Sequence, residues 1–186
     1  MNWHFDIIAG LYDHAIAAPD PMRLAKALRL PTPGLLLDAG GGTGRVAASL
    51  HKQVGSWMIS DLSAPMLAQA QAKGVVFPTR AVVERLPFAD ATFDRVLAVD
   101  ALHHFADQRL AIAELVRVLK PGGRIVIEEP DIRRPQVKLV ALAEKLALMG
   151  SHFASPQQIS ALLAAHGLSP TVEDDGEFNA WVMADK

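Results

Sequence analysis

Residues 35–50 read LLLDAGGGTGRVAASL, and this stretch decides the fold. Three leucines and an aspartate are typical of a buried parallel strand, whereas Arg45–Leu50 is typical of a helix. Between them lie Gly40, Gly42 and Gly44, although glycine weakens both strands and helices. A glycine loop between a strand and a helix lets a ligand approach the backbone and the N–H groups at the helix start. One glycine would indicate only a tight turn, but three at this spacing predict a site for a nucleotide-like ligand.

The composition is that of a single domain with a substantial core. The chain has 186 residues, of which 51% are hydrophobic, and its net charge of −2 argues against a nucleic-acid partner. The absence of cysteine excludes disulfides and thiolate metal sites, and it agrees with a reducing compartment. No apolar run approaches the length of a membrane span, and the first residues do not resemble a secretory signal. We therefore expect a cytoplasmic protein.

The rest of the chain alternates strand-like and helix-like runs. The strand-like runs after the first are 56–60, 75–78, 95–99 and 124–128. The helix-like runs are 43–52, 63–73, 107–119, 135–149 and 155–166. This alternation predicts an α/β, Rossmann-like, doubly wound and mostly parallel sheet of seven strands with helices on both faces. Two extended pieces around Asp175-Gly176 predict a C-terminal hairpin that adds an antiparallel strand.

Asp61 is the acidic partner of the glycine loop. It ends the second predicted strand, 21 positions after Gly40, so the two should meet at one edge of the sheet. A carboxylate there can accept both hydroxyls of a ribose, although it could also be a simple loop acid. Dinucleotide folds use G-x-G-x-x-G, whereas this loop reads G-x-G-x-G followed by Arg45. The spacing therefore disfavours NAD.

The motif LLDAGGGTG resembles the first motif of class I S-adenosylmethionine-dependent methyltransferases. Residues 5–13 resemble the N-terminal lid of the type 11 small-molecule group, which includes the ubiquinone and menaquinone C-methyltransferases. Residues 60–67 resemble the ribose motif of that group, and 84–105 and 114–130 resemble its later motifs. The resemblance implies an enzyme that uses S-adenosylmethionine to methylate a small molecule.

The resemblance also assigns a set of cofactor-binding residues. They are Asp38, Gly40, Gly42, Gly44, Asp61, Leu62, Met66, Val82, Val83 and Asp100. Leu62 or Met66 would pack on the adenine, and Asp38 would organise the amino end of the cofactor, directly or through water. Asp100 would lie against the methionine moiety, often through its backbone carbonyl.

One position departs from the family pattern. Val82 stands where many relatives carry an acid that binds the adenine amino group. Backbone groups of Val82 and Val83, or the side chain of Glu84, would then have to take that role.

Methyl transfer from a sulfonium is an in-line displacement, so the protein mainly aligns the nucleophile. A proton acceptor is needed only where the nucleophile must lose a proton. His103 and His104 follow the fourth predicted strand and could orient the acceptor or act as a base, or they could simply pack there. Tyr12 could contact the sulfonium by a cation–π interaction or anchor the first helix. These three residues are the catalytic candidates, and no carboxylate at useful sequence spacing predicts a metal.

We expect one methyltransferase domain over residues 1–186, divided into four parts. These are a lid and helix (1–33), a cofactor core (34–130), an acceptor-site insertion (131–154) and a C-terminal helix and hairpin (155–186). The apolar helix of the insertion favours an apolar or aromatic acceptor, or else packs in a monomer or a homodimer. A non-catalytic module that binds S-adenosylmethionine and an NAD(P)-dependent oxidoreductase remain as alternatives. The acceptor, and whether C, N or O is methylated, are not predicted.

Overall fold

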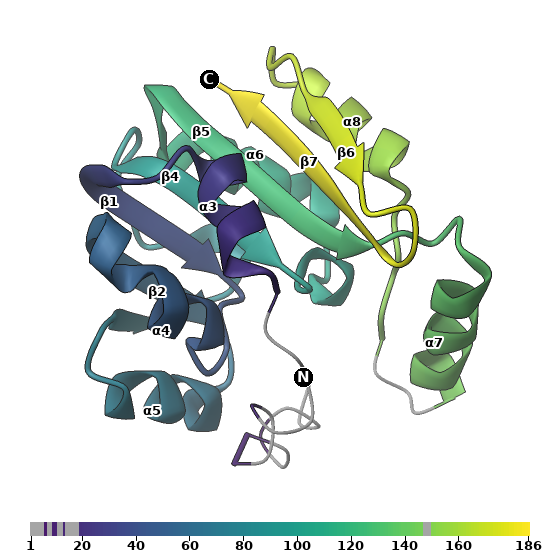
Figure 1. The fold of residues 1–186 in the computed structure, drawn as a ribbon, viewed down its shortest axis with the longest axis horizontal. Helices are drawn as coiled ribbons and strands as arrows, with labels where there is room; N and C mark the ends of the chain where they lie inside the picture. The colour runs from purple at the N-terminus through teal and green to yellow at the C-terminus, as the bar shows by residue number, and fades with distance from the viewer. Residues whose placement is uncertain (1–5, 7–8, 11–12, 14–18, 147–149) are drawn as a thin grey trace.

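The computed structural model describes residues 6, 9–10, 13, 19–146 and 150–186. Its centre is one seven-stranded sheet with the strand order β3-β2-β1-β4-β5-β7-β6 (Figure 1). The strands are β1 (Thr32–Ala39), β2 (Val54–Asp61), β3 (Phe77–Arg80), β4 (Phe93–Val99), β5 (Leu119–Pro130), β6 (Thr171–Asp174) and β7 (Asn179–Asp185). Strand β7 runs antiparallel to both of its neighbours, β5 and β6, and the other described pairs are parallel. The predicted fold class and its antiparallel C-terminal hairpin are confirmed.

Helices cover both faces of the sheet. The helices are α3 (Pro21–Leu28), α4 (Arg45–Leu50), α5 (Ala64–Ala72), α6 (Gln108–Val118), α7 (Pro135–Leu146) and α8 (Pro156–Ala164). Short 3-10 turns are η1 (His51–Gln53), η2 (Val83–Arg85) and η3 (Leu102–His104). Helices α3 and α4 lie on one face, and α6 and α8 lie on the other (Figure 1).

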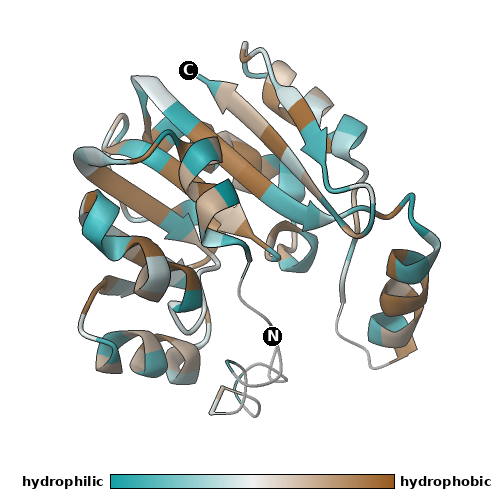
Figure 2. Cartoon of the chain, viewed as in Figure 1, coloured by the Kyte–Doolittle hydropathy of each residue, from teal (hydrophilic) through white to brown (hydrophobic). Residues whose placement is uncertain are grey.

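The central strands are buried on both faces, which explains their continuous apolar runs. In β1, Leu36 packs into the core cluster that contains Leu24 of α3, whereas Leu37 packs into the cluster that contains Ile112 of α6. Both leucines are completely buried, and apolar residues dominate the inner strands (Figure 2). Successive side chains of a strand point to opposite faces, so the LLL run supplies both cores.

Side-chain caps fix the starts of two helices, close to the first residues of the predicted runs 63–73 and 155–166. The Ser63 hydroxyl accepts a hydrogen bond from the Met66 N–H at the start of α5. Ser155 and Gln158 form a capping box at the start of α8. A capping side chain satisfies an N–H group that the helix itself leaves without a partner.

Strand β5 differs from its prediction at its start. The Leu119–Pro130 strand begins five residues before the predicted position and includes Pro121-Gly122-Gly123, which lie between the predicted helix 107–119 and the predicted strand 124–128. Leu119 pairs with Phe93, and the register shifts before Arg95 pairs with Arg124. The glycines therefore lie in an irregular first part of the strand.

Helix α7 lies beside the body of the molecule rather than on the sheet (Figure 1). Val137 is its one buried residue, whereas Leu139, Leu142 and Leu146 are 69%, 53% and 76% exposed. Apolar colour is visible along this helix (Figure 2). No helix in the described ranges is both long and apolar enough to cross a membrane.

Candidate cofactor and acceptor site

The carboxyl ends of β1, β2 and β4 meet at one edge of the sheet, and the candidate site is built there. Ala39 at the end of β1 pairs with Ser60, and the Gly40 N–H donates to the Ser60 carbonyl at 2.7 Å. This pairing brings the glycine loop beside Asp61, as the sequence predicts.

The three predicted glycines have different physical roles. All have positive φ, at +72° for Gly40, +53° for Gly42 and +73° for Gly44. A Cβ atom on Gly40 would lie 2.7 Å from the Ala101 Cβ, and one on Gly44 would lie 3.2 Å from Ala70. A Cβ on Gly42 would meet nothing closer than 4.0 Å. Packing therefore excludes a side chain most strongly at Gly40 and less strongly at Gly44, whereas Gly42, of these three, faces open space beside Asp61.

Asp61 joins the glycine loop to the start of α5. Its Oδ2 accepts the Gly42 N–H at 3.0 Å, and its Oδ1 accepts the Ser63 N–H at 2.8 Å. Burial raises the pKa of Asp61, although these backbone donors oppose the shift. Each carboxylate oxygen has a second acceptor position, so Asp61 can still accept hydroxyl groups from a ligand.

Asp38 lies at the bottom of the site. It is 1% exposed, and within the described part of the chain its Oδ2 has no hydrogen-bond partner. Burial raises its pKa to about 7, although the nearby Trp57 side chain and the charge of Arg45 oppose the shift. Asp38 lines a small recess of about 30 Å³ together with the glycine loop, Arg45 and Asp100. A buried carboxylate oxygen without a donor is costly, and a cationic group entering this recess would relieve that cost.

Asp100 has an unusual backbone conformation at the end of β4. Its φ is +52°, which is rare for a residue with a side chain. Its N–H donates to the Glu128 carbonyl at 2.9 Å, and its Oδ2 lies 3.8 Å from the Arg45 guanidinium. Burial raises the pKa of its carboxyl. The conformation turns the chain away from the sheet directly beside the recess.

The four residues expected around the adenine divide into two pairs. Leu62 and Val82 are 46% and 43% exposed, whereas Met66 and Val83 are buried. The exposed pair can offer apolar surface to a planar ring, and the buried pair supports them from the core. Glu84 accepts the Asp107 N–H at 3.2 Å, so its side chain is directed toward α6.

Two acids of the N-terminal segment bind the site, and sequence reasoning gave them no role. Asp13 accepts the Thr43 hydroxyl, and its Oδ2 lies 2.7 Å from the Lys73 ammonium. Asp6 accepts the Ser63 hydroxyl at 2.6 Å. Their neighbour Tyr12 lies outside the described residues, so its predicted contact with the sulfonium stays a prediction. The resemblance of residues 5–13 to a lid was the available signal for these contacts.

The histidine pair has a carboxylate partner that sequence spacing did not reveal. His103 is 2% exposed, and its Nδ1 lies 2.6 Å from the Glu129 Oε2. Glu129 is 26 residues away in sequence, so the spacing around the histidines gave no sign of this contact. Although burial opposes the charged form, Glu129 raises the pKa of His103. Burial, together with the charge of His103, lowers the pKa of His104 to about 3.

The register of the sheet explains this contact. Val99 pairs with Glu128, so Glu129 lies just beyond the end of β4, where the chain turns into η3. The Glu129 Oε1 accepts the N–H groups of Ala101 and Leu102 at 2.9 and 2.7 Å. The carboxylate thereby fixes the turn that carries the histidines.

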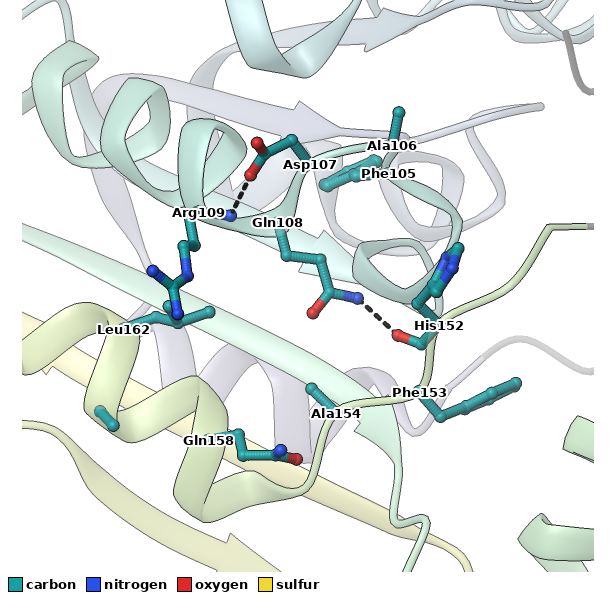
Figure 3. Close-up of a pocket in the computed structure, with 11 residues that line it drawn as sticks. Phe105, Ala106, Asp107, Gln108, Arg109, His152, Phe153, Ala154, Gln158 and Leu162 are labelled. Atoms are coloured by element: carbon teal, nitrogen blue, oxygen red, sulfur yellow. Dashed lines mark hydrogen bonds between the residues drawn. The ribbon is translucent and has the colours of Figure 1, made fainter.

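A larger pocket of about 600 Å³ opens between the start of α6 and α8 (Figure 3). Phe153 and His152 line it, and the Gln108 amide donates to the His152 carbonyl at 2.5 Å. The Phe153 ring stacks on His103 with 4.3 Å between centroids. The pocket and the histidine pair are thus neighbours.

Comparisons with known proteins agree with this geometry. A family model described as "Methyltransferase domain" matches residues 37–127. The ubiquinone/menaquinone biosynthesis C-methyltransferase UbiE of Saccharophagus degradans is 37% identical over 118 residues, which are 58% of this chain and 47% of that protein. The chain spans about half the length of the curated relatives it matches.

Solved structures share the fold over most or all of the chain. A Thermotoga maritima structure described as a SAM-dependent methyltransferase, possible histamine N-methyltransferase, has a TM-score of 0.81 and 21% identity, with both chains fully covered. Geranyl diphosphate C-methyltransferase of Streptomyces coelicolor, in complex with S-adenosylhomocysteine, has a TM-score of 0.76 and 20% identity over 89% of this chain and 76% of that one. Sequence and fold agree: residues 37–127 match the methyltransferase domain family, and the chain shares the fold of solved S-adenosylmethionine-dependent methyltransferases.

Proposed function

We propose that this chain binds S-adenosylmethionine at the edge formed by β1, β2 and β4 and catalyses methyl transfer to a small, apolar or aromatic acceptor. The observation that carries the proposal is Asp38, whose buried Oδ2 lacks a hydrogen-bond partner among the described residues and which lines a recess beside the glycine loop. The amino group of the cofactor supplies the positive charge that this oxygen lacks.

The other predicted residues have consistent roles in this proposal. Asp61 accepts the ribose hydroxyls, and its backbone hydrogen bonds hold both oxygens in place beforehand. Leu62, Met66 and the Val82–Val83 segment enclose the adenine, and Asp100 bounds the methionine moiety. The cofactor supplies an activated methyl group, so the protein has to align the acceptor in line with it and exclude water.

The acceptor would occupy the side of the site that is formed by η3 and the insertion 131–154. Phe153 offers apolar surface there, because its ring stacks on His103. The names of the relatives agree with an acceptor of this kind, because they concern quinone biosynthesis and geranyl diphosphate. The same proposal includes a division of the domain into four parts: a lid and helix (1–33), a cofactor core (34–130), an acceptor-site insertion (131–154) and a C-terminal helix and hairpin (155–186). The lid and the insertion would enclose the acceptor.

Calorimetry with S-adenosylmethionine, S-adenosylhomocysteine and NAD tests cofactor binding. At about 100 times Kd, either adenosyl ligand should add roughly 2.7 kcal/mol to the free energy of unfolding. Binding of NAD alone would contradict the proposal. Mass spectrometry of quinol, prenyl and phenol acceptors then tests turnover. Tight cofactor binding with no methylated product would favour the non-catalytic module instead.

A further inference from the structure

Two histidines and one glutamate, from segments far apart in sequence, converge beside the proposed acceptor site. His103 and His104 belong to η3, and Glu144 belongs to α7. One potential ligand atom from each residue lies within 4.8 Å of the other two. Two histidines with one carboxylate are a donor set found in catalytic zinc sites.

Glu144 is the member that points most directly to a cation. Its Oε2 is buried and has no hydrogen-bond partner among the described residues. The helix that carries it has exposed leucines, so the glutamate is directed inward while apolar groups face solvent. A buried carboxylate oxygen without a donor costs several kcal/mol unless a cation or proton satisfies it.

His103 already has the outer partner that a metal-binding histidine normally has. Glu129 contacts its Nδ1 at 2.6 Å and is itself held by two backbone N–H groups, which leaves Nε2 as the ligand atom. Such a carboxylate fixes the ring orientation and increases the basicity of the ligand nitrogen. The His104 Nδ1 lies 3.2 Å from the Ser151 hydroxyl, which orients the second ring in a similar way.

The charges around the pair also favour a cation. Asp100, Glu129 and Glu144 all act electrostatically on His103. Phe153 stacks on the same ring and excludes water from that side. Arg45 lies beside Asp100, so Glu129 and Glu144 are the carboxylates whose negative charge a divalent ion would balance.

We propose that His103, His104 and Glu144 bind one Zn²⁺ ion. At ligand distances of about 2.0–2.2 Å, ligand atoms lie roughly 3.4 Å apart, so the Glu144 side chain would have to close by roughly 1 Å. The fourth position would face the acceptor side and could receive an oxygen of the acceptor. Zinc binding itself does not depend on the proposed function, whereas the contact with an acceptor oxygen rests on it.

The test is a titration of metal-free protein with Zn²⁺ by calorimetry, and with Co²⁺ by visible absorption. Wild type should bind one equivalent, and Glu144→Gln and His104→Asn should bind at least tenfold more weakly. Glu173→Gln is the matched control, because this exposed glutamate lies on the edge strand β6. Circular dichroism confirms that each variant is folded. His103 is left unchanged, because its replacement would also strand Glu129.

Hydrogen exchange of α7 gives a second readout. Zinc should slow exchange in α7 of wild type and not in Glu144→Gln, because the ion would tie the helix to η3. Absence of stoichiometric binding, or equal affinity of wild type and Glu144→Gln, would overturn the proposal. Cofactor calorimetry on the metal-free protein separates this result from the proposed function, because the zinc ligands do not line the Asp38 recess.

Discussion

Replacement of Asp38 by asparagine should remove a loss of stability that the unliganded protein suffers as the pH rises, and it should weaken binding of the cofactor. A carboxyl whose pKa rises from 3.8 to about 7 opposes folding once it ionises. It stabilises the folded state at low pH, where the folded protein keeps the proton. That stabilisation is lost as the pH rises toward 7.

The size of this effect follows from the two pKa values. Between pH 5 and pH 8, wild type should lose about 2.5 kcal/mol of unfolding free energy through Asp38 alone. Asparagine cannot ionise, so Asp38→Asn should lack this loss. The variant should therefore gain about 2.5 kcal/mol on wild type over the same pH range, whatever its stability at pH 5.

Cofactor binding should respond in the opposite direction. The proposed contact with the amino group needs the ionised carboxylate, so below pH 7 wild-type affinity should rise with pH by up to about tenfold per unit. Asp38→Asn should bind more weakly at pH 8 and should show a flatter dependence on pH. The variant would exchange function for stability, as strained binding sites commonly do.

Urea unfolding and calorimetry at pH 5, 6, 7 and 8 measure both effects. Asp90→Asn is the control. This exposed aspartate lies just before the first residue of β4, whereas the candidate site lies at the last residues of that strand. Parallel stability curves for Asp38→Asn and wild type would refute the raised pKa. Unchanged affinity for S-adenosylmethionine in Asp38→Asn would refute the proposed contact.

Three further predictions follow from particular contacts. Asp61→Ala should weaken binding of S-adenosylmethionine by about 1–3 kcal/mol in calorimetry, because a charge-assisted acceptor is lost, and an unchanged Kd would exclude the ribose role. Gly40→Ala should lower the unfolding free energy more than Gly42→Ala, since the added Cβ meets Ala101 at 2.7 Å in the first case and nothing within 4.0 Å in the second. Gly42→Ala should instead lose more free energy of cofactor binding, measured by calorimetry, than free energy of unfolding, measured in urea. A larger loss of unfolding free energy in Gly42→Ala than in Gly40→Ala would contradict these roles. Ser155→Ala should cost about 1 kcal/mol of unfolding free energy through loss of the capping box, with cofactor affinity unchanged.

Most of the fold could be predicted because its signals are local. The LLL run, the Ser63 and Ser155 caps and the Asp175-Gly176 turn each depend on a few neighbouring residues. The irregular start of β5 could not be predicted in this way. It depends on the pairing of Leu119 with a residue of β4 that is distant in sequence.

The candidate cofactor site could be predicted for a similar reason. Asp38, the glycines and Asp61 directly follow or end neighbouring strands, and parallel strands bring such residues to one edge. The sequence could not show which glycines are needed for protein packing and which leave space for a ligand. The positions of Ala101 and Ala70, which decide the roles of Gly40 and Gly44, come from other elements of the fold.

The acceptor side is different, because its contacts join segments whose meeting is set by long-range packing. Glu129 could have been expected beside His103 from the pairing of β4 with β5, since residues just beyond the ends of adjacent parallel strands lie close together. Glu144 could not, because α7 buries only Val137 and no periodic pattern fixes which of its faces turns toward η3. The proposed cofactor half of the site is therefore encoded by motifs, whereas the proposed acceptor half depends on the placement of one helix. A family resemblance carried by motifs consequently identifies the cofactor and leaves the acceptor to be determined from α7 and the residues it faces.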